Sequence, residues 1–98
     1  MPQLSRTEID HFLKSEPEWK FEDGKLVRDW TFKNFVEAMS FVNQVAEQAE
    51  AAGHHPDIDI RYNNVRLALV SHDAGGITGR DVAMASELNK RFSAPRKS

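Results

Sequence analysis

Residues 57–69 read DIDIRYNNVRLAL, and this stretch decides the fold. Apolar and polar residues alternate on both sides of Asn63-Asn64, which is typical of two half-buried strands joined by a tight turn. If the turn consists of these two residues, each pair on one face of the hairpin is apolar: Tyr62 with Val65, Ile60 with Leu67, and Ile58 with Leu69. The sequence therefore predicts an antiparallel hairpin with one buried face.

A second hairpin is predicted around Asp23-Gly24, because both residues tolerate the positive φ angles of a two-residue turn. This turn joins residues 19–22 to residues 25–28 and pairs Phe21 with Leu26. The apolar residues then gather on one face with a period of two: Trp19, Phe21, Leu26 and Trp30. The two hairpins most simply form one four-stranded antiparallel sheet.

Helical spacing of apolar residues appears before each hairpin. The first helix follows a cap at Ser5 or Thr7 and ends before Pro17. The second helix is long and free of proline, and we expect it to end at Gly53. Glycine favours a helix end because it adopts the left-handed conformation without a steric penalty.

A third helix is predicted after Gly75-Gly76. Thr78 can cap it and Asp81 stands at its N3 position, so Asp81 is a capping residue first and a candidate site carboxylate second. The glycine pair lacks the lysine and the spacing of a phosphate-binding loop, and we interpret it as a flexible turn. Residues 1–98 are thus predicted to form one α+β domain, with three helices packed on one face of a four-stranded antiparallel sheet.

Composition excludes several classes of function. The chain has 98 residues, no cysteine and a formal net charge of −2, so disulfides, thiolate metal sites and a strong nucleic-acid footprint are excluded. No stretch approaches the ~20 apolar residues of a membrane span. We predict a soluble, cytoplasmic protein without nucleic-acid or membrane partners, whose small core favours stabilisation by oligomerisation.

Three of the four histidines are expected to converge. The hairpin register, extended beyond Leu69, sets His55 opposite His72 and leaves His54 one residue away. Strand alternation predicts that the cluster emerges on the sheet face that the helices do not cover. Imidazole exchanges protons near neutral pH, and neighbouring rings disfavour simultaneous protonation, so one can act as acid and another as base. His11 is interpreted as a surface or boundary residue.

A zinc site is the alternative for such a cluster, since three histidines and a water form a known catalytic arrangement. Adjacent residues of an extended segment point to opposite sides, so His54 and His55 are poorly placed to share one ion. The sequence therefore favours a metal-free site.

Several motifs together carry a family resemblance: EAAGHHP at residues 50–56, YNNV at residues 62–65, and SHDAGGIT with a following aspartate at residues 71–81. With TFKNF at residues 31–35 and Ala38, they resemble the pterin-4a-carbinolamine dehydratase family from Trp19 to Ala85. Paired histidines before a proline and a further histidine before Gly-Gly rarely recur together by chance.

The resemblance implies dehydration of 4a-hydroxy-tetrahydropterin to quinonoid dihydropterin, which recycles the cofactor of aromatic amino-acid hydroxylases. It implies that His54 and His72 are acid/base groups and that His55, Glu50 and Asp81 bind the substrate. It implies a small-molecule pterin as partner, no metal and no bound cofactor, and a homodimer or homotetramer.

The sequence departs from the family pattern at two places. Gly53 stands where some relatives have aspartate, and Ile58-Asp59 replace an aromatic pair of animal members. The preferred pterin side chain and any animal-type partner therefore do not follow from the resemblance. Some relatives act as dimerisation or scaffold cofactors of other proteins, and this is the alternative function. Fold alone does not determine function, so the choice depends on the site. The three converging histidines favour the enzyme, because a pure scaffold has no need of them.

Overall fold

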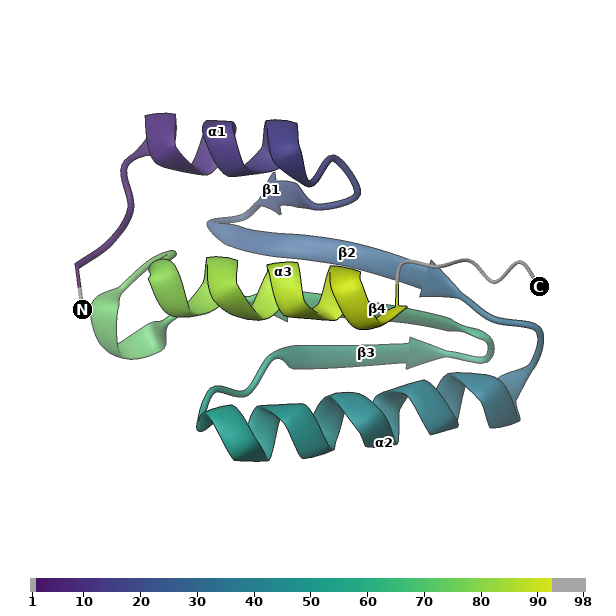
Figure 1. Cartoon of the computed structure of the whole chain (residues 1–98). Helices are drawn as coiled ribbons and strands as arrows, with labels where there is room; N and C mark the ends of the chain where they lie inside the picture. The colour runs from purple at the N-terminus through teal and green to yellow at the C-terminus, as the bar shows by residue number, and fades with distance from the viewer. Residues whose placement is uncertain (1, 93–98) are drawn as a thin grey trace.

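The computed structural model describes residues 2–92, as a four-stranded antiparallel sheet with three α-helices (Figure 1). The elements follow one another as α1 (Arg6–Ser15), β1 (Lys20–Glu22), β2 (Lys25–Thr31), α2 (Phe35–Ala52), β3 (Asp57–Arg61), β4 (Asn64–Leu69), the short 3-10 helix η1 (His72–Ala74) and α3 (Gly79–Phe92). The strand order in the sheet is β1-β2-β4-β3. The predicted α+β class and order of elements are confirmed.

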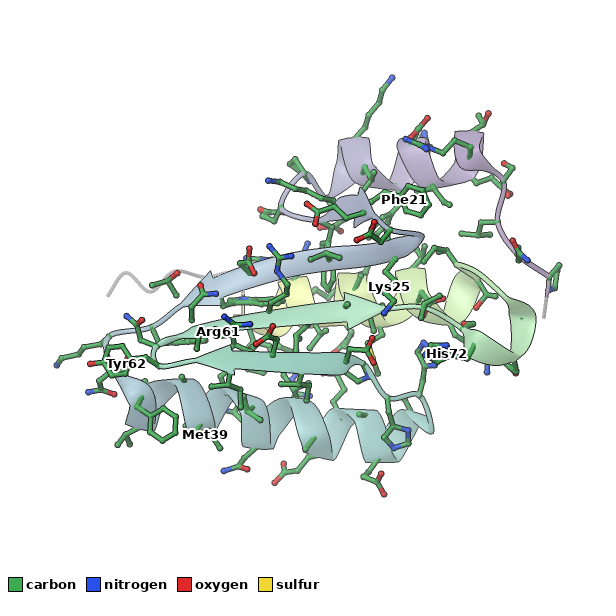
Figure 2. The ribbon with its side chains drawn as sticks, turned by 180° about the vertical axis from the view of Figure 1, so that it is seen from behind. Phe21, Lys25, Met39, Arg61, Tyr62 and His72 are labelled. Atoms are coloured by element: carbon green, nitrogen blue, oxygen red, sulfur yellow. The ribbon has the colours of Figure 1, made fainter. Side chains whose placement is uncertain are left out.

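One face of the sheet carries the hydrophobic core. The buried strand residues on this face are Leu26, Trp30, Val65, Leu67 and Leu69, and they pack against buried residues of all three helices. Figure 1 shows α3 crossing in front of the sheet, with α1 along β1 and α2 along β3. The opposite view shows the strands in front of α3 (Figure 2). Each large apolar side chain buried in this way contributes roughly 1.5–3 kcal/mol.

α1 begins with a capping box. Glu8 N–H donates to Ser5 Oγ at 3.1 Å, and Ser5 N–H donates to Glu8 Oε1 at 2.7 Å. This reciprocal pair satisfies two backbone donors that the first helical turn leaves free. Of the two predicted caps, Ser5 is therefore the one used, and the helix ends at Ser15, before Pro17, as expected.

The Asp23-Gly24 turn has the predicted register. Both residues have positive φ, at 52° and 77°, and Phe21 pairs with Leu26. β2 continues to Thr31, which makes it longer than its partner β1. The turn was predictable because its conformation depends on the two turn residues themselves.

The second hairpin differs from the prediction by one step. Tyr62 and Asn63 form the turn, so Ile60 pairs with Val65 and Arg61 pairs with Asn64. Asn64 belongs to β4 because it pairs with Thr31 of β2 on its other side. Asn63 is anchored as well, since its Nδ2 donates to Phe32 O at 2.8 Å. The pairing shifts by two residues, so Ile58 and Ile60 stay on the face of Leu67 and Val65. The predicted pair of Tyr62 with Val65 is wrong, because Tyr62 lies in the turn and is 65% exposed, and Ile58 is also exposed, so β3 does not have the predicted buried face.

Candidate active site

Three segments that are distant in the sequence meet at one end of the sheet: the link from α2 to β3, the turn after β4, and the start of α3. Hydrogen bonds connect His54, Ser71, Thr78 and Asp81 across these segments, and all four residues are buried. Polar side chains rarely stay buried without partners, and a connected set of them is a candidate functional site.

The end of α2 directs His54 into this cluster. Gly53 has φ of 65°, as predicted, and its N–H donates to Glu50 O at 3.3 Å, while His54 N–H donates to Ala49 O at 3.2 Å. These two bonds form the Schellman motif that commonly ends a helix. The left-handed residue reverses the chain, so His54 turns beneath α3 instead of continuing along α2.

His54 and Asp81 form a buried pair. His54 Nε2 lies 2.5 Å from Asp81 Oδ1, and the two side chains are 8% and 0% exposed. The other carboxylate oxygen, Oδ2, accepts from Ser71 Oγ at 2.8 Å and from Thr78 N–H at 2.9 Å. The Thr78 contact also confirms the predicted role of Asp81 at the N3 position of α3. Asp81 thus caps the helix and binds the histidine at the same time.

The number of available protons sets the direction of each bond around Asp81. The hydroxyl group of Ser71 donates its single hydrogen to Asp81. In the contact of 2.8 Å between the Ser71 and Thr78 hydroxyls, Thr78 is therefore the donor and Ser71 Oγ the acceptor. When Asp81 is ionised, its carboxylate accepts in every one of these bonds, and His54 then donates its Nε2–H. The second ring nitrogen, Nδ1, then carries a lone pair in the neutral ring. An imidazole held in one tautomer by a carboxylate is suited to accept a proton on its free nitrogen.

His72 is the residue that follows Ser71, so the same network holds its backbone. It begins η1, and its exposed side chain is labelled in Figure 2. Gly75 N–H donates to His72 O at 3.2 Å to close the turn. Next to His72, Arg80 donates to Asp73 Oδ1 at 2.6 Å, and this hydrogen bond holds the pKa of the Asp73 carboxyl below its ordinary value.

His55 and Glu50 form a second, exposed pair. His55 Nε2 lies 2.6 Å from Glu50 Oε2, and their side chains are 59% and 77% exposed. Exposed pairs of this kind add little to stability, typically about 0–1 kcal/mol. The two histidines of the motif therefore have different environments, one buried against α3 and one open to solvent beside the end of α2.

The predicted route to the histidine cluster is wrong in two respects. β3 begins at Asp57 and the paired part of β4 ends at Leu69, so His55 does not pair with His72 across a hairpin. His54 is also not on the open face, because it contacts Asp81 of α3 on the face that the helices cover. The positions of the three histidines depend on a Schellman motif and on the turn after β4, neither of which follows from strand alternation. His11 is exposed on α1, as expected.

A cavity of about 410 Å³ lies between the second half of α2 and the first turns of α3. Four of its lining residues are apolar and four are polar or charged: Ala51, Ala52, Ala83 and Met84, and Gln48, His54, Arg80 and Glu87. Of the three histidines proposed from the sequence, His54 lines this cavity, whereas His55 and His72 are not among its lining residues. Sequence reasoning missed Arg80 and the roles of Ser71 and Thr78 beside Asp81. A serine or threonine that follows a strand has no sequence pattern that separates a site residue from an ordinary loop residue.

Two kinds of feature are absent from the described residues 2–92. Within this range no three His, Cys, Asp or Glu side chains are arranged to hold a metal ion. No helix in the same range has the length and apolar character needed to cross a membrane.

Comparison with known proteins identifies relatives over almost the whole chain. A family model described as pterin 4 alpha carbinolamine dehydratase matches residues 2–91. A Chloroflexus aurantiacus protein named "Putative pterin-4-alpha-carbinolamine dehydratase" is 53% identical over 90 residues, which cover 92% of this chain and 97% of the relative. A protein of the same name from Acidobacterium capsulatum is 57% identical over 88 residues, with 90% and 96% covered.

Two solved structures are similar to this chain. The crystal structure of a transcriptional coactivator/pterin dehydratase from Brucella melitensis is 33% identical, with a TM-score of 0.83 over 90% of this chain and 96% of that chain. A pterin dehydratase-like protein described as a RuBisCO assembly factor in the alpha-carboxysome is 19% identical, with a TM-score of 0.59 over 74% and 83%, and shares the fold.

Fold and site together define a small α+β protein with a buried histidine–carboxylate pair at one end of its sheet. The chain belongs to the pterin-4-alpha-carbinolamine dehydratase family, since the family model and the relatives cover nearly all of it.

Proposed function

We propose that this protein dehydrates 4a-hydroxy-tetrahydropterin to quinonoid dihydropterin, with His54 and His72 as the acid/base groups. Membership of the family supports the reaction. The observation that carries the catalytic assignment is the His54–Asp81 pair, 2.5 Å apart and buried. A buried imidazole with a carboxylate on one nitrogen keeps the other nitrogen in a defined state for proton transfer.

The reaction needs one proton donor and one proton acceptor. The bond between C4a and the hydroxyl oxygen breaks, the hydroxyl leaves as water after gaining a proton, and N5 gives up its proton as the new double bond forms. General acid–base assistance of this kind typically contributes about 10²–10⁴-fold. His54 and His72 fill the two roles, and each turnover leaves one ring a proton richer and the other a proton poorer until solvent restores them.

The remaining candidates have supporting roles in this proposal. His55 and Glu50 are exposed at the end of α2, where they are free to contact a substrate. Asp81 is 0% exposed and its oxygens have donors already, so it acts on the substrate through His54. Family membership further supports recycling of the pterin cofactor of aromatic amino-acid hydroxylases, in the cytoplasm, by a homodimer or homotetramer.

A second candidate function is a scaffold or dimerisation cofactor without catalysis. It is supported by the name of the Brucella melitensis relative, which joins a transcriptional coactivator to a pterin dehydratase. The structural neighbour described as an assembly factor bears on the fold alone. The His54–Asp81 network favours the enzyme, because a scaffold has no need of a buried imidazole with a free nitrogen.

The test is a direct assay of carbinolamine loss. A hydroxylase generates the 4a-carbinolamine from a tetrahydropterin, and purified protein is added in increasing amounts. We expect a rate that exceeds the uncatalysed loss, rises linearly with protein and saturates with substrate, before and after treatment with a chelator. A rate equal to the uncatalysed loss would support the scaffold, and zinc in stoichiometric amount that is lost together with activity would contradict the metal-free site.

A further inference from the structure

The segment before α1 lies across the turn that carries His72. Gln3 Nε2 donates to Ala74 O at 2.8 Å, and Leu4 N–H donates to Ile77 O at 2.7 Å. Figure 1 shows this extended segment running beside the loop between β4 and α3. Gln3 and Ala74 are 71 residues apart in the sequence, so this contact exists only in the folded chain.

The two glycines of this turn have different reasons to be glycine. Gly75 has φ of 75°, a conformation that other residues adopt with strain. Gly76 has no such requirement, but a Cβ added to it would lie 2.7 Å from Oε1 and 2.9 Å from Cδ of Gln3. Gly76 therefore leaves the space that the Gln3 side chain occupies.

The turn is also held by backbone bonds between Ser71 and Gly76 and by the contact of Arg80 with Asp73, and Gln3 adds a bond to the Ala74 carbonyl. η1 consists of three residues, and its N-cap Ser71 makes no side-chain capping bond, because the Ser71 hydroxyl is bonded to Asp81. The His72 side chain is exposed and the turn projects from the sheet. Short 3-10 segments are weakly held by their own hydrogen bonds. The carbonyl that Gln3 binds belongs to Ala74, the last residue of this element.

We propose that Gln3 is a positioning residue that holds the η1 turn, and with it the imidazole of His72, in its reactive orientation. Gln3 contacts the backbone of the turn, so it acts through His72. The catalytic part of this inference rests on the proposed function, in which His72 exchanges a proton with the pterin. A group that positions an acid or base without binding substrate changes kcat and leaves KM nearly constant.

The first test compares Gln3→Ala with Gln44→Ala. Gln44 is a matched control, since it is also exposed and its Nε2 also donates to a backbone carbonyl, that of Ser40 on α2. Loss of one such hydrogen bond corresponds to a decrease in kcat of about 3- to 10-fold for Gln3→Ala. We expect an unchanged KM in that variant and wild-type constants in Gln44→Ala. An unchanged kcat in Gln3→Ala, or a loss that appears in KM alone, would overturn the proposal.

A second variant reaches the same contact from the other side. Gly76→Ala should displace the flexible Gln3 side chain and reproduce the kcat of Gln3→Ala. Once Gln3 is alanine, the added methyl group meets none of the Gln3 atoms that crowd it, so the double variant should be no worse than either single one. Losses that multiply in the double variant would show that Gly76 acts independently of Gln3 and would count against the proposal.

Amide hydrogen exchange separates this inference from the dehydratase assignment. In Gln3→Ala, the Gly75 and Gly76 amides, which bond to His72 O and Ser71 O, should exchange about 3- to 10-fold faster. Amides in the middle of α2 should keep their rates. If the wild-type protein lacks dehydratase activity, the proposed function fails while the exchange experiment still shows whether Gln3 holds the turn. Unchanged exchange at both glycines would overturn the inference whatever the activity.

Discussion

Asp81 is the most constrained residue of the candidate site. It is fully buried, caps α3 through Thr78 N–H, accepts from Ser71, and binds His54. A carboxylate fits this position because both of its oxygens can accept hydrogen bonds, whereas an amide of the same size offers one accepting oxygen. Stability and the tautomer of His54 therefore depend on the same side chain.

We predict that Asp81→Asn loses both stability and activity. The amide nitrogen of asparagine would face the Nε2–H of His54, so either a buried donor loses its acceptor, at a cost of about 1–3 kcal/mol in the free energy of unfolding, or the imidazole changes to the other tautomer. Misorientation of the imidazole should lower kcat about 10- to 10⁴-fold. Urea unfolding and steady-state kinetics measure the two effects, with Asp10→Asn, an exposed aspartate on α1, as control. Wild-type kcat in Asp81→Asn would show that His54 needs no orienting carboxylate.

His55 should behave differently from the acid/base pair. Its side chain is exposed and bonded to Glu50, so in our proposal it contributes contacts that are equal in the ground state and the transition state. His55→Ala is expected to raise KM more than it lowers kcat, and Glu50→Gln should change KM in the same direction by a smaller factor. Steady-state kinetics of both variants provide the measurement. A loss confined to kcat in His55→Ala would move this residue into the catalytic group.

Among the elements, the end of α2 determines where His54 and His55 lie. Gly53 takes the left-handed conformation, and a Cβ added there would meet no atom within 4 Å. The cost of a larger residue is therefore conformational, with no steric clash against a neighbour. The same turn directs His54 inward while His55 remains exposed.

Gly53→Ala is expected to lower the free energy of unfolding by about 1–2 kcal/mol. Gly53→Asn should lower it by less than half of that amount, because asparagine adopts the left-handed conformation more readily than alanine. Both values are obtained from urea denaturation with spectroscopic detection. Equal stability of the wild-type protein and Gly53→Ala would mean that the left-handed turn is not needed to end α2.

The two hairpins show what local sequence can predict. The Asp23-Gly24 turn follows from its own residues, and its predicted register is confirmed. The turn near Asn63-Asn64 was predicted one step too late, because Asn64 pairs with Thr31 on a neighbouring strand. A residue that pairs on two sides is determined by tertiary contacts, which outweigh its preference for turns.

For the whole molecule, the α+β class and the order of elements were predictable because apolar periodicity reports which face of each element is buried. The site was predictable only in part. The sequence proposes the histidines as site residues and predicts the capping role of Asp81, but the contact between His54 and Asp81 joins residues 27 apart. The hydrogen bond from Gln3 to Ala74 joins residues that are 71 positions apart in the sequence. Such contacts depend on how helices pack on the sheet, which a single sequence does not specify.

In our proposal, His54 and His72 share the proton transfers of pterin dehydration. Steady-state kinetics of His54→Ala, His72→Ala and the double variant provide the test. Each single variant should lose kcat within or below the ~10²–10⁴-fold range of general acid–base catalysis, because the other imidazole still assists. The double variant, with folding verified separately, should be far slower than either. Turnover at the wild-type rate in the double variant would contradict the mechanism and leave the histidines with a structural role.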